Sequence, residues 1–302
     1  MTRRPVVAVL LANWNGARFI DEAITSVVGQ SFTDWVLIAV DTGSRDDSPA
    51  IIKKWAATDA RIQPVLIPQR LSYPEALNLG LARAQGDYVA RIESDDVWLP
   101  ERLQRQIEFY SQADNSSVGV CGTDALLVNE FGRPVRLKQF PRLHVDCLKA
   151  IWYRNPFCNS SVLIRMAALA EIGGYDPSFY MVEDLELWFR LGRQWSLRNI
   201  PEALVRYRVW PDSTSSRRLA KVAWLGGKVR RRAARKFGYR MPGLAYAYNL
   251  TSVAAGVLPP LLARRVFECF VGLGGRREMG KSLLKSRAQR SSYRSVLTGG
   301  QT

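Results

Sequence analysis

Apolar runs and amphipathic segments alternate regularly over the first 110 residues of the chain. The run Val6–Leu11 is continuous and rich in valine, which is typical of a parallel strand covered on both faces. Apolar side chains then recur at helical spacing up to Gly29, a residue type that often ends a helix. The same alternation predicts strands at Trp35–Val40, Ile62–Ile67 and Tyr88–Ile92, and helices at Ser48–Ala57, Pro74–Gln85 and Pro100–Tyr110. This order predicts an α/β fold with a mostly parallel sheet flanked by helices.

The pattern is less regular after Tyr110. Further strands are expected at Val118–Val128, Val162–Ile164 and Arg206–Val209, and a helix at Leu185–Leu191. The aromatic side chains of this helix, Trp188 and Phe189, fit the protein core better than a platform for a sugar ring, which is the alternative. The chain contains no internal repeat.

Polar segments directly follow three of the predicted strands. These segments are Asn13–Asn15, Asp41–Asp47 and Glu93–Asp96. Ligands of open α/β sheets bind outside the carboxyl ends of the strands. We therefore expect the three segments to lie together and to form a ligand site.

Three carboxylates crowd the last of these segments, Glu93-Ser94-Asp95-Asp96. Like charges at this spacing repel one another unless a cation neutralises them. Carboxylate oxygens suit Mg²⁺ or Mn²⁺, which commonly also hold substrate phosphates. The alternative is a solvated acidic turn in which Asp96 lies near the N-terminus of the next helix.

The formal net charge of the 302-residue chain is +16, and the excess lies entirely at its end. Arg217–Thr302 holds 19 Lys and Arg but 2 Asp and Glu, whereas the residues before it hold 24 and 25. This shift predicts two regions, 1–216 and 217–302. It also favours a polyanionic partner for the second region, either anionic lipid or nucleic acid.

The basic region contains two segments that suit a membrane surface. From Leu219 to Phe237, apolar residues fall on one helical face among Lys and Arg, although Gly226-Gly227 weakens this helix. Gly243–Ala263 is an uncharged stretch of 21 residues, long enough to span a bilayer. Because Pro259-Pro260 interrupts it, we expect it to lie in the membrane interface, with spanning as the alternative.

Cysteine and histidine usage narrows the class of protein further. None of the four cysteines has CxxC spacing, which favours reduced thiols in a cytoplasmic protein. The single histidine, His144, has no ligand cluster around it in the sequence, so a zinc site is not expected. The N-terminus lacks the longer apolar region and cleavage site of a signal peptide.

Six parts of the sequence resemble, in order, the motifs of family 2 glycosyltransferases. They are Val6–Gly16, Val40–Asp47, Ala76–Ala90, Glu93–Arg102, Gly173–Tyr175 with Glu183–Trp188, and Arg206–Arg208 with Ser213 and Ser215. The resemblance covers roughly Val6–Ser216 and does not extend to Arg217 and beyond.

The resemblance implies a GT-A (Rossmann-like) fold, a nucleoside diphosphate sugar as donor, a divalent metal (Mn²⁺ or Mg²⁺) and inversion at the anomeric carbon. The donor-binding residues that it implies are Asn13, Asn15, Asp41, Asn78, Glu93 and Ser94. Asp41 would contact the nucleoside and Glu93 would lie near the ribose. Asp95 would be the main metal ligand, with Asp96 next to it. The residues expected on the acceptor side are Glu183, Trp188 and Asn159, and Asp184 would be the catalytic base.

Elementary chemistry agrees with these roles. A metal stabilises the diphosphate leaving group as a Lewis acid, and a carboxylate such as Asp184 can take the proton of an acceptor hydroxyl. Attack from the face opposite the leaving group inverts the anomeric carbon, by analogy with glycoside hydrolysis. Without the resemblance, Glu183-Asp184 would be interpreted as a helix cap. Trp152 and Tyr153 precede Asn155-Pro156, where stacking on an acceptor sugar is plausible.

The sequence departs from the family pattern at four positions. Thr42 replaces a second acidic residue, which leaves the nucleobase open among uracil, thymine and guanine. Glu93 replaces the first aspartate of the DxD motif and keeps its charge. Asn159 and Trp210 stand where many relatives carry histidines.

We therefore expect a glycosyltransferase that acts on a lipid-linked saccharide acceptor in surface polysaccharide synthesis. Its expected place is the cytoplasm, peripheral on the inner face of the cell membrane. One alternative is a nucleic-acid-binding protein, against which the apolar runs of the basic region argue. Another is an inactive relative that serves as a scaffold on a polyanion. The oligomeric state is open.

Overall fold

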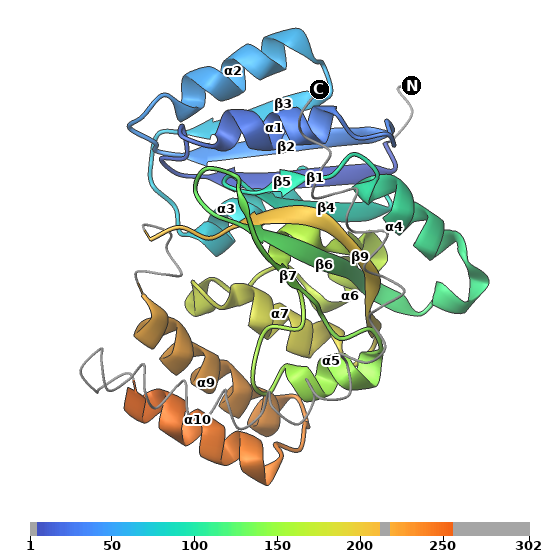
Figure 1. Cartoon of the computed structure of the whole chain (residues 1–302), viewed down its shortest axis with the longest axis vertical. Helices are drawn as coiled ribbons and strands as arrows, with labels where there is room; N and C mark the ends of the chain where they lie inside the picture. Colours follow the sequence, from blue (N-terminus) through green and yellow to red (C-terminus); the bar gives the residue numbers. More distant parts are fainter. Residues whose placement is uncertain (1–4, 212–217, 256–302) are drawn as a thin grey trace.

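A single mixed sheet of nine strands forms the centre of the molecule (Figure 1). The computed structural model describes residues 5–211 and 218–255. The strands are β1 (Val7–Asn13), β2 (Trp35–Thr42), β3 (Ile62–Ile67), β4 (Tyr88–Glu93), β5 (Val97–Trp98), β6 (Val118–Val128), β7 (Pro134–Lys138), β8 (Leu163–Arg165) and β9 (Ser196–Arg208). Their order is β3-β2-β1-β4-β8-β6-β9-β5, and β7 pairs with β6.

The first half of the sheet is parallel, as the alternation of strands and helices predicts. Strands β3, β2, β1 and β4 run parallel, whereas β8 is antiparallel to both β4 and β6. The predicted strands and helices of this half are confirmed to within a few residues, except that the helix expected at Pro74–Gln85 ends at Leu81. β9 is much longer than the strand expected at Arg206–Val209.

Helices cover both faces of the sheet. They are α1 (Ile20–Val28), α2 (Ser48–Thr58), α3 (Tyr73–Leu81), α4 (Arg102–Ser111), α5 (His144–Ala150), α6 (Met166–Ile172), α7 (Glu183–Leu191), α9 (Leu219–Lys236) and α10 (Gly243–Ala255). Short 3₁₀ turns lie at Ala113–Asn115, Asn159–Ser161 and Pro177–Phe179. The sequence pattern did not predict β7, α5 or α6.

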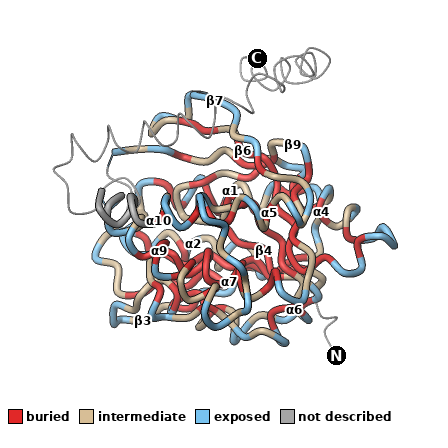
Figure 2. The backbone as a smooth tube through the Cα atoms, turned by 90° about the horizontal axis from the view of Figure 1, so that it is seen from below, coloured by how far each residue is buried: buried red, intermediate tan, exposed pale blue. Residues whose placement is uncertain are grey.

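Two hydrophobic clusters pack against opposite faces of the sheet. Because side chains alternate along a strand, Val7, Val9 and Leu11 join one cluster and Ala8, Leu10 and Ala12 the other. The first cluster contains residues of α1, α2 and α4, and the second contains residues of α3, α6, α7 and α9. Buried residues concentrate around β4 and β6 in the middle of the molecule (Figure 2).

The predicted basic helix is confirmed as α9, and Gly226-Gly227 lies inside it without breaking it. The protein covers part of its apolar face: Val229 and Ala233 are fully buried in the core cluster that includes α7, whereas Trp224 is 40% exposed. Gly226 packs on α7, where a Cβ in its place would lie 3.8 Å from the Leu185 side chain, an ordinary contact distance. The protein itself thus covers part of the face that the sequence assigned to a membrane.

The uncharged stretch from Gly243 begins with α10, which packs on α9. None of the helices in the described ranges is long and apolar enough to cross a membrane. Residues 256–263 of the stretch lie outside the described residues, as do Ser213, Ser215 and Cys269. The boundary after Ser216 stays a prediction, although α9 shares a core with the residues before that boundary.

Candidate active site

The three polar segments that follow β1, β2 and β4 meet at one edge of the sheet, as expected. In the register of these parallel strands, Asn13 lies opposite Asp41, and Ala12 lies opposite Glu93. Gly16 closes the turn after β1, where a Cβ would come within 2.1 Å of the Asn13 side chain and 2.9 Å of the Ser94 hydroxyl. A larger residue at Gly16 would displace these side chains, so the glycine lets Asn13 and Ser94 lie close together at the edge.

Asn13 and Asp41 form a buried pair at this edge. The Asn13 amide donates to the Asp41 carboxylate at 2.6 Å, and the Ser44 hydroxyl donates to the same carboxylate oxygen at 2.6 Å. The Ser44 hydroxyl also accepts a hydrogen bond from the Asn15 backbone N–H at 2.8 Å. The side-chain carbonyl oxygen of Asn13 is buried without a hydrogen-bond partner, which leaves an acceptor for a ligand donor group. Sequence reasoning did not single out Ser44.

Glu93, Asp95 and Asp96 form the acidic cluster: they offer oxygen atoms that all lie within 4.8 Å of one another. Burial raises the pKa of Glu93 to about 7, although Arg91 opposes this effect. Burial also raises the pKa of Asp95 and Asp96, and repulsion from Asp95 and Glu93 adds to the shift at Asp96. A divalent cation would relieve this strain on the ionised carboxylates, so the three residues fit a metal such as Mn²⁺ or Mg²⁺.

The two aspartates of the cluster differ in what their oxygens do. Asp96 is 1% exposed, and its oxygens accept from the Ser160 hydroxyl and from the Arg208 backbone N–H. Asp96 therefore joins the end of β9 to the turn Asn159–Ser161. Because the protein already uses both of its carboxylate oxygens, Asp96 has little capacity left to bind a metal. Asp95 accepts only one side-chain hydrogen bond among the described residues, from the Trp210 indole N–H at 2.9 Å. Asp95 is thus the better placed ligand.

Arg208 fixes the loop that carries Asp95. Its guanidinium donates to the Asp95 backbone carbonyl at 2.8 Å and pairs with Glu22 at 2.5 Å. The same group lies 4.3 Å from the centre of the Phe19 ring. The end of β9, the start of α1 and the acidic cluster therefore form one unit. In this unit Trp210 occupies the position where many relatives in the family pattern carry a histidine.

Asp184 lies at the start of α7 and is held by two asparagines. The amide of Asn155 donates to one carboxylate oxygen at 2.5 Å, and the amide of Asn159 donates to the same oxygen. The other oxygen accepts from the Leu185 backbone N–H at 2.7 Å. The helix-cap alternative fails in part, because Val182 occupies the N-cap and no side chain caps the helix there. Asn159 also lies near enough to Glu93 to lower the pKa of that carboxyl, so it stands between the acidic cluster and Asp184.

Arg91 is a buried cation that sequence reasoning missed. It is fully buried on β4, 3.3 Å from a Glu93 oxygen and 3.7 Å from a Glu183 oxygen. Its guanidinium lies 5.3 Å from the ring centres of both Tyr73 and Tyr175. Burial and the neighbouring Asp184 carboxylate raise the pKa of Glu183 to about 8. The signal in the sequence was an arginine inside an otherwise apolar strand.

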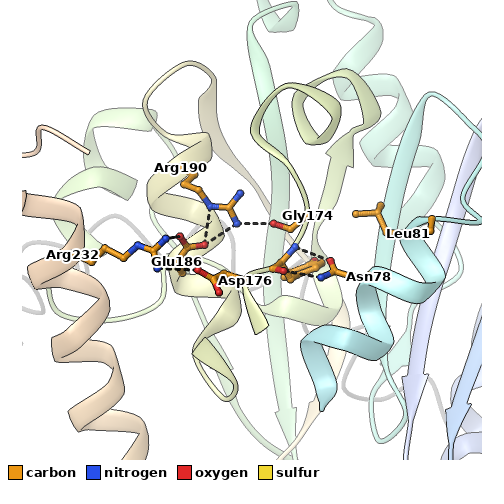
Figure 3. A pocket seen from close by; sticks show the side chains of 9 residues that line it. Asn78, Leu81, Gly174, Asp176, Glu186, Arg190 and Arg232 are labelled. Carbon is orange, nitrogen blue, oxygen red and sulfur yellow. Dashed lines mark hydrogen bonds and ion pairs between the residues drawn. The ribbon is translucent and has the colours of Figure 1, made fainter. Parts of the chain in front are cut away.

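Three expected site residues have structural contacts of their own. Trp188 is fully buried and packs edge-on against Phe157 at 5.0 Å, so it lies beneath the site and does not reach an acceptor. Asn78 donates to and accepts from the backbone of Tyr175, which ties α3 to the loop before α7 (Figure 3). Glu183 is 4% exposed and faces Arg91, below Asp184. His144 accepts a hydrogen bond from the Leu197 backbone.

Comparisons with known proteins agree with this geometry. A family model described as glycosyl transferase family 2 matches residues 8–172. The chain is 32% identical to the putative glycosyltransferase EpsE of Bacillus subtilis over 72% of this chain and 77% of that protein. It is 29% identical to the putative teichuronic acid biosynthesis glycosyltransferase TuaG of the same organism, over 73% and 86%.

A solved structure supports the fold. The mannosyltransferase PcManGT of Pyrobaculum calidifontis, in complex with GDP-Man and Mn²⁺, superposes with a TM-score of 0.58 at 18% identity. The match covers 98% of this chain and 84% of that one. The likeness confirms the fold class predicted from the sequence, a Rossmann-like sheet flanked by helices.

Proposed function

Since the chain belongs to glycosyl transferase family 2, we propose that it moves a sugar from a nucleoside diphosphate sugar to a hydroxyl group of a lipid-linked saccharide, with inversion at the anomeric carbon. The observation that carries this proposal is the position of Asn159, whose amide donates to Asp184 and which lies near enough to Glu93 to act on the pKa of that carboxyl. It brings a carboxylate suited to a base beside a cluster suited to a metal-bound diphosphate. Relatives named for polysaccharide synthesis support a role in making a surface polymer.

The donor would lie along the edge formed by β1, β2 and β4. Asp41 and the free carbonyl of Asn13 suit hydrogen-bond donors of a nucleoside. Asp95 and Glu93 would hold the metal, while Asp96 braces the loop behind them. The metal, when bound, supplies positive charge to the diphosphate leaving group. The Mn²⁺ complex of PcManGT supports this assignment.

The acceptor hydroxyl would lie on the other side of Asn159, beside Asp184. The amides of Asn155 and Asn159 fix the orientation of the Asp184 carboxylate. A carboxylate held in this way can take the hydroxyl proton as the oxygen attacks the anomeric carbon. The proton then rests on Asp184, the new glycosidic bond forms, and the nucleoside diphosphate leaves from the opposite face.

The test is incubation with Mn²⁺ and a panel of UDP-, dTDP- and GDP-sugars, with release of nucleoside diphosphate as the readout. We expect slow release with one nucleotide class, because water can replace the acceptor, and faster release when a matching saccharide or lipid-linked saccharide is added. A folded protein that releases no nucleotide from any donor, with acceptors of both kinds present, would contradict the proposal.

Trp210 provides a test of the metal site in particular. Partners that orient a metal ligand typically contribute 10- to 100-fold to affinity. Replacement of Trp210 by Phe keeps an aromatic ring but removes the N–H that donates to Asp95. We expect Mn²⁺ affinity, measured by EPR titration, to fall about 10-fold. The matched control is Trp195→Phe, which removes an indole bond to Glu171 away from the cluster. Equal Mn²⁺ affinity in Trp210→Phe and wild type would exclude this role.

A further inference from the structure

We propose that the outer face of α9 docks on an anionic lipid bilayer and that this docking places the acceptor side of the site beside the bilayer surface. The docking itself is argued from the structure of α9 alone. The placement of the acceptor side beside the bilayer rests on the proposed function. We call this surface the basic face; it consists of Lys221, Trp224, Lys228, Arg231 and Arg235.

The basic face is a continuous stripe of one helix. Its residues are spaced three or four apart, which places them along one side of α9. Lys221, Lys228 and Arg235 are exposed, and Trp224 is 40% exposed. None of these cations pairs with a carboxylate in the described part of the chain, and residues 219–255 contain no Asp or Glu. The face therefore presents unneutralised positive charge.

Aromatic and aliphatic side chains are exposed on α9 and on the neighbouring α10. The Lys228 ammonium lies 4.2 Å from the centre of the Trp224 ring. α10 packs beside α9, where the buried Arg230 donates to Asn249 at 3.2 Å, and it exposes Leu244 (81%) and Tyr246 (55%). Lys and Arg together with exposed Trp, Tyr and Leu are typical of helices that lie in a lipid interface. This mixture favours a bilayer over nucleic acid.

The edge of the basic face contacts the acceptor side of the site, because Arg232, four residues after Lys228, lies next to that face. Arg232 pairs with Asp176 at 2.9 Å, directly after Gly173-Gly174-Tyr175, and lies 3.8 Å from Glu186 on α7 (Figure 3). Glu186 in turn pairs with Arg190 at 2.7 Å. These contacts fix α9 to the loop and the helix that carry the proposed base.

The thickness of α9 sets the distance between the bilayer surface and the proposed base. Gly226 of α9 approaches Leu185, which directly follows Asp184. A helix with its side chains is about 10 Å across, so the bilayer surface would lie about one helix diameter from the start of α7. An acceptor saccharide on a lipid anchor could then reach Asp184 without leaving the bilayer.

The experiment measures binding of the full chain to vesicles by sedimentation, with vesicles of phosphatidylcholine alone and with added phosphatidylglycerol. The test variant carries Lys221→Glu, Lys228→Glu and Arg235→Glu. The control variant carries Lys53→Glu, Lys54→Glu and Arg83→Glu, which change the net charge equally on exposed parts of α2 and the end of α3. Thermal unfolding shows that each variant is folded.

We expect wild type to bind the anionic vesicles selectively. Since each Lys or Arg near an anionic surface contributes about 1 kcal/mol, the test variant should bind at least 10-fold more weakly, and the control within about threefold of wild type. If both variants lose vesicle binding equally, net charge alone drives the binding. If neither variant loses it, another segment docks on the vesicles. Either result overturns the proposal. A third outcome is that wild type binds duplex DNA but not vesicles, and that the test variant loses this DNA binding. That outcome would assign the basic face to nucleic acid instead.

Vesicle binding requires neither donor nor acceptor, so this test is independent of catalysis. An Asp184→Asn variant should bind vesicles like wild type. If vesicles bind through the basic face while no nucleotide is released from any donor, the proposed function fails and the docking surface stands. If transfer occurs and vesicles do not bind, only the docking surface fails.

Discussion

Replacement of Asp184 by Asn should lower the rate constant of transfer by about 10²- to 10⁴-fold, the range that general base catalysis contributes. The substitution keeps the size of the side chain but removes its ability to take a proton. It also replaces the negative charge to which the Asn155 and Asn159 amides donate by a neutral group. In the proposed arrangement the donor would lie on the far side of Asn159, so donor affinity should stay within about threefold of wild type.

The measurement is initial-rate release of nucleoside diphosphate at saturating donor and acceptor, with donor affinity measured separately. Asp114→Asn is the matched control, because Asp114 is an exposed aspartate in a 3₁₀ turn that follows α4. Near-wild-type turnover in Asp184→Asn would show that another group takes the proton. A loss of donor affinity equal to the loss of rate would assign Asp184 to binding and not to proton transfer.

Loss of the metal should have the second largest effect. Asp95→Ala removes the carboxylate whose oxygens are least used by the protein, and we expect turnover to fall by about 10²-fold or more, because a Lewis-acid metal contributes several kcal/mol to such a step. EDTA should have the same effect on wild type, and added Mn²⁺ should restore the rate only there. Asp114→Ala should respond to EDTA and Mn²⁺ like wild type.

This prediction separates Asp95 from Asp96. Asp96 holds Ser160 and the backbone of Arg208, so its loss should disturb folding more than metal binding. Turnover by Asp95→Ala that equals wild type, or activity of wild type that survives complete chelation, would mean that the acidic cluster does not work through a metal.

The first half of the fold could be predicted because its signals are local. Val7–Asn13 and Trp35–Thr42 are buried at every position, and apart from their polar last residues they therefore appear as unbroken apolar runs. Parallel strands place their carboxyl ends at one edge, so the segments after them could be brought together from sequence alone. Asn13, Asp41 and the acidic cluster follow from this rule.

The acceptor side was less predictable because its contacts are distant in sequence. Asn155 and Asn159 meet Asp184 across more than 20 residues, and Arg91 meets Glu183 across an even longer separation. No short pattern records such pairs. The resemblance to family 2 glycosyltransferases indicated Asp184, but it did not indicate that Glu183 turns toward a buried arginine or that Trp188 lies under the site.

The basic region shows the limit of amphipathic patterns. The sequence predicted α9, and the helix forms, but the pattern alone does not say what covers an apolar face. In the structure Val229 and Ala233 pack into the core with α7, and the charged face with Trp224 is left outside. The proposed membrane docking would therefore depend on charge and interfacial aromatics and not on the apolar face of α9.

The most direct test of the account is donor binding, read as the thermal unfolding midpoint of the full chain with Mn²⁺ and a panel of UDP-, dTDP- and GDP-sugars. We predict a rise in Tm for one nucleotide class, lost with EDTA and in Asp95→Ala, because a ligand that binds only the folded state stabilises it. A folded wild-type protein whose Tm does not respond to any of these donors would contradict a metal-dependent glycosyltransferase.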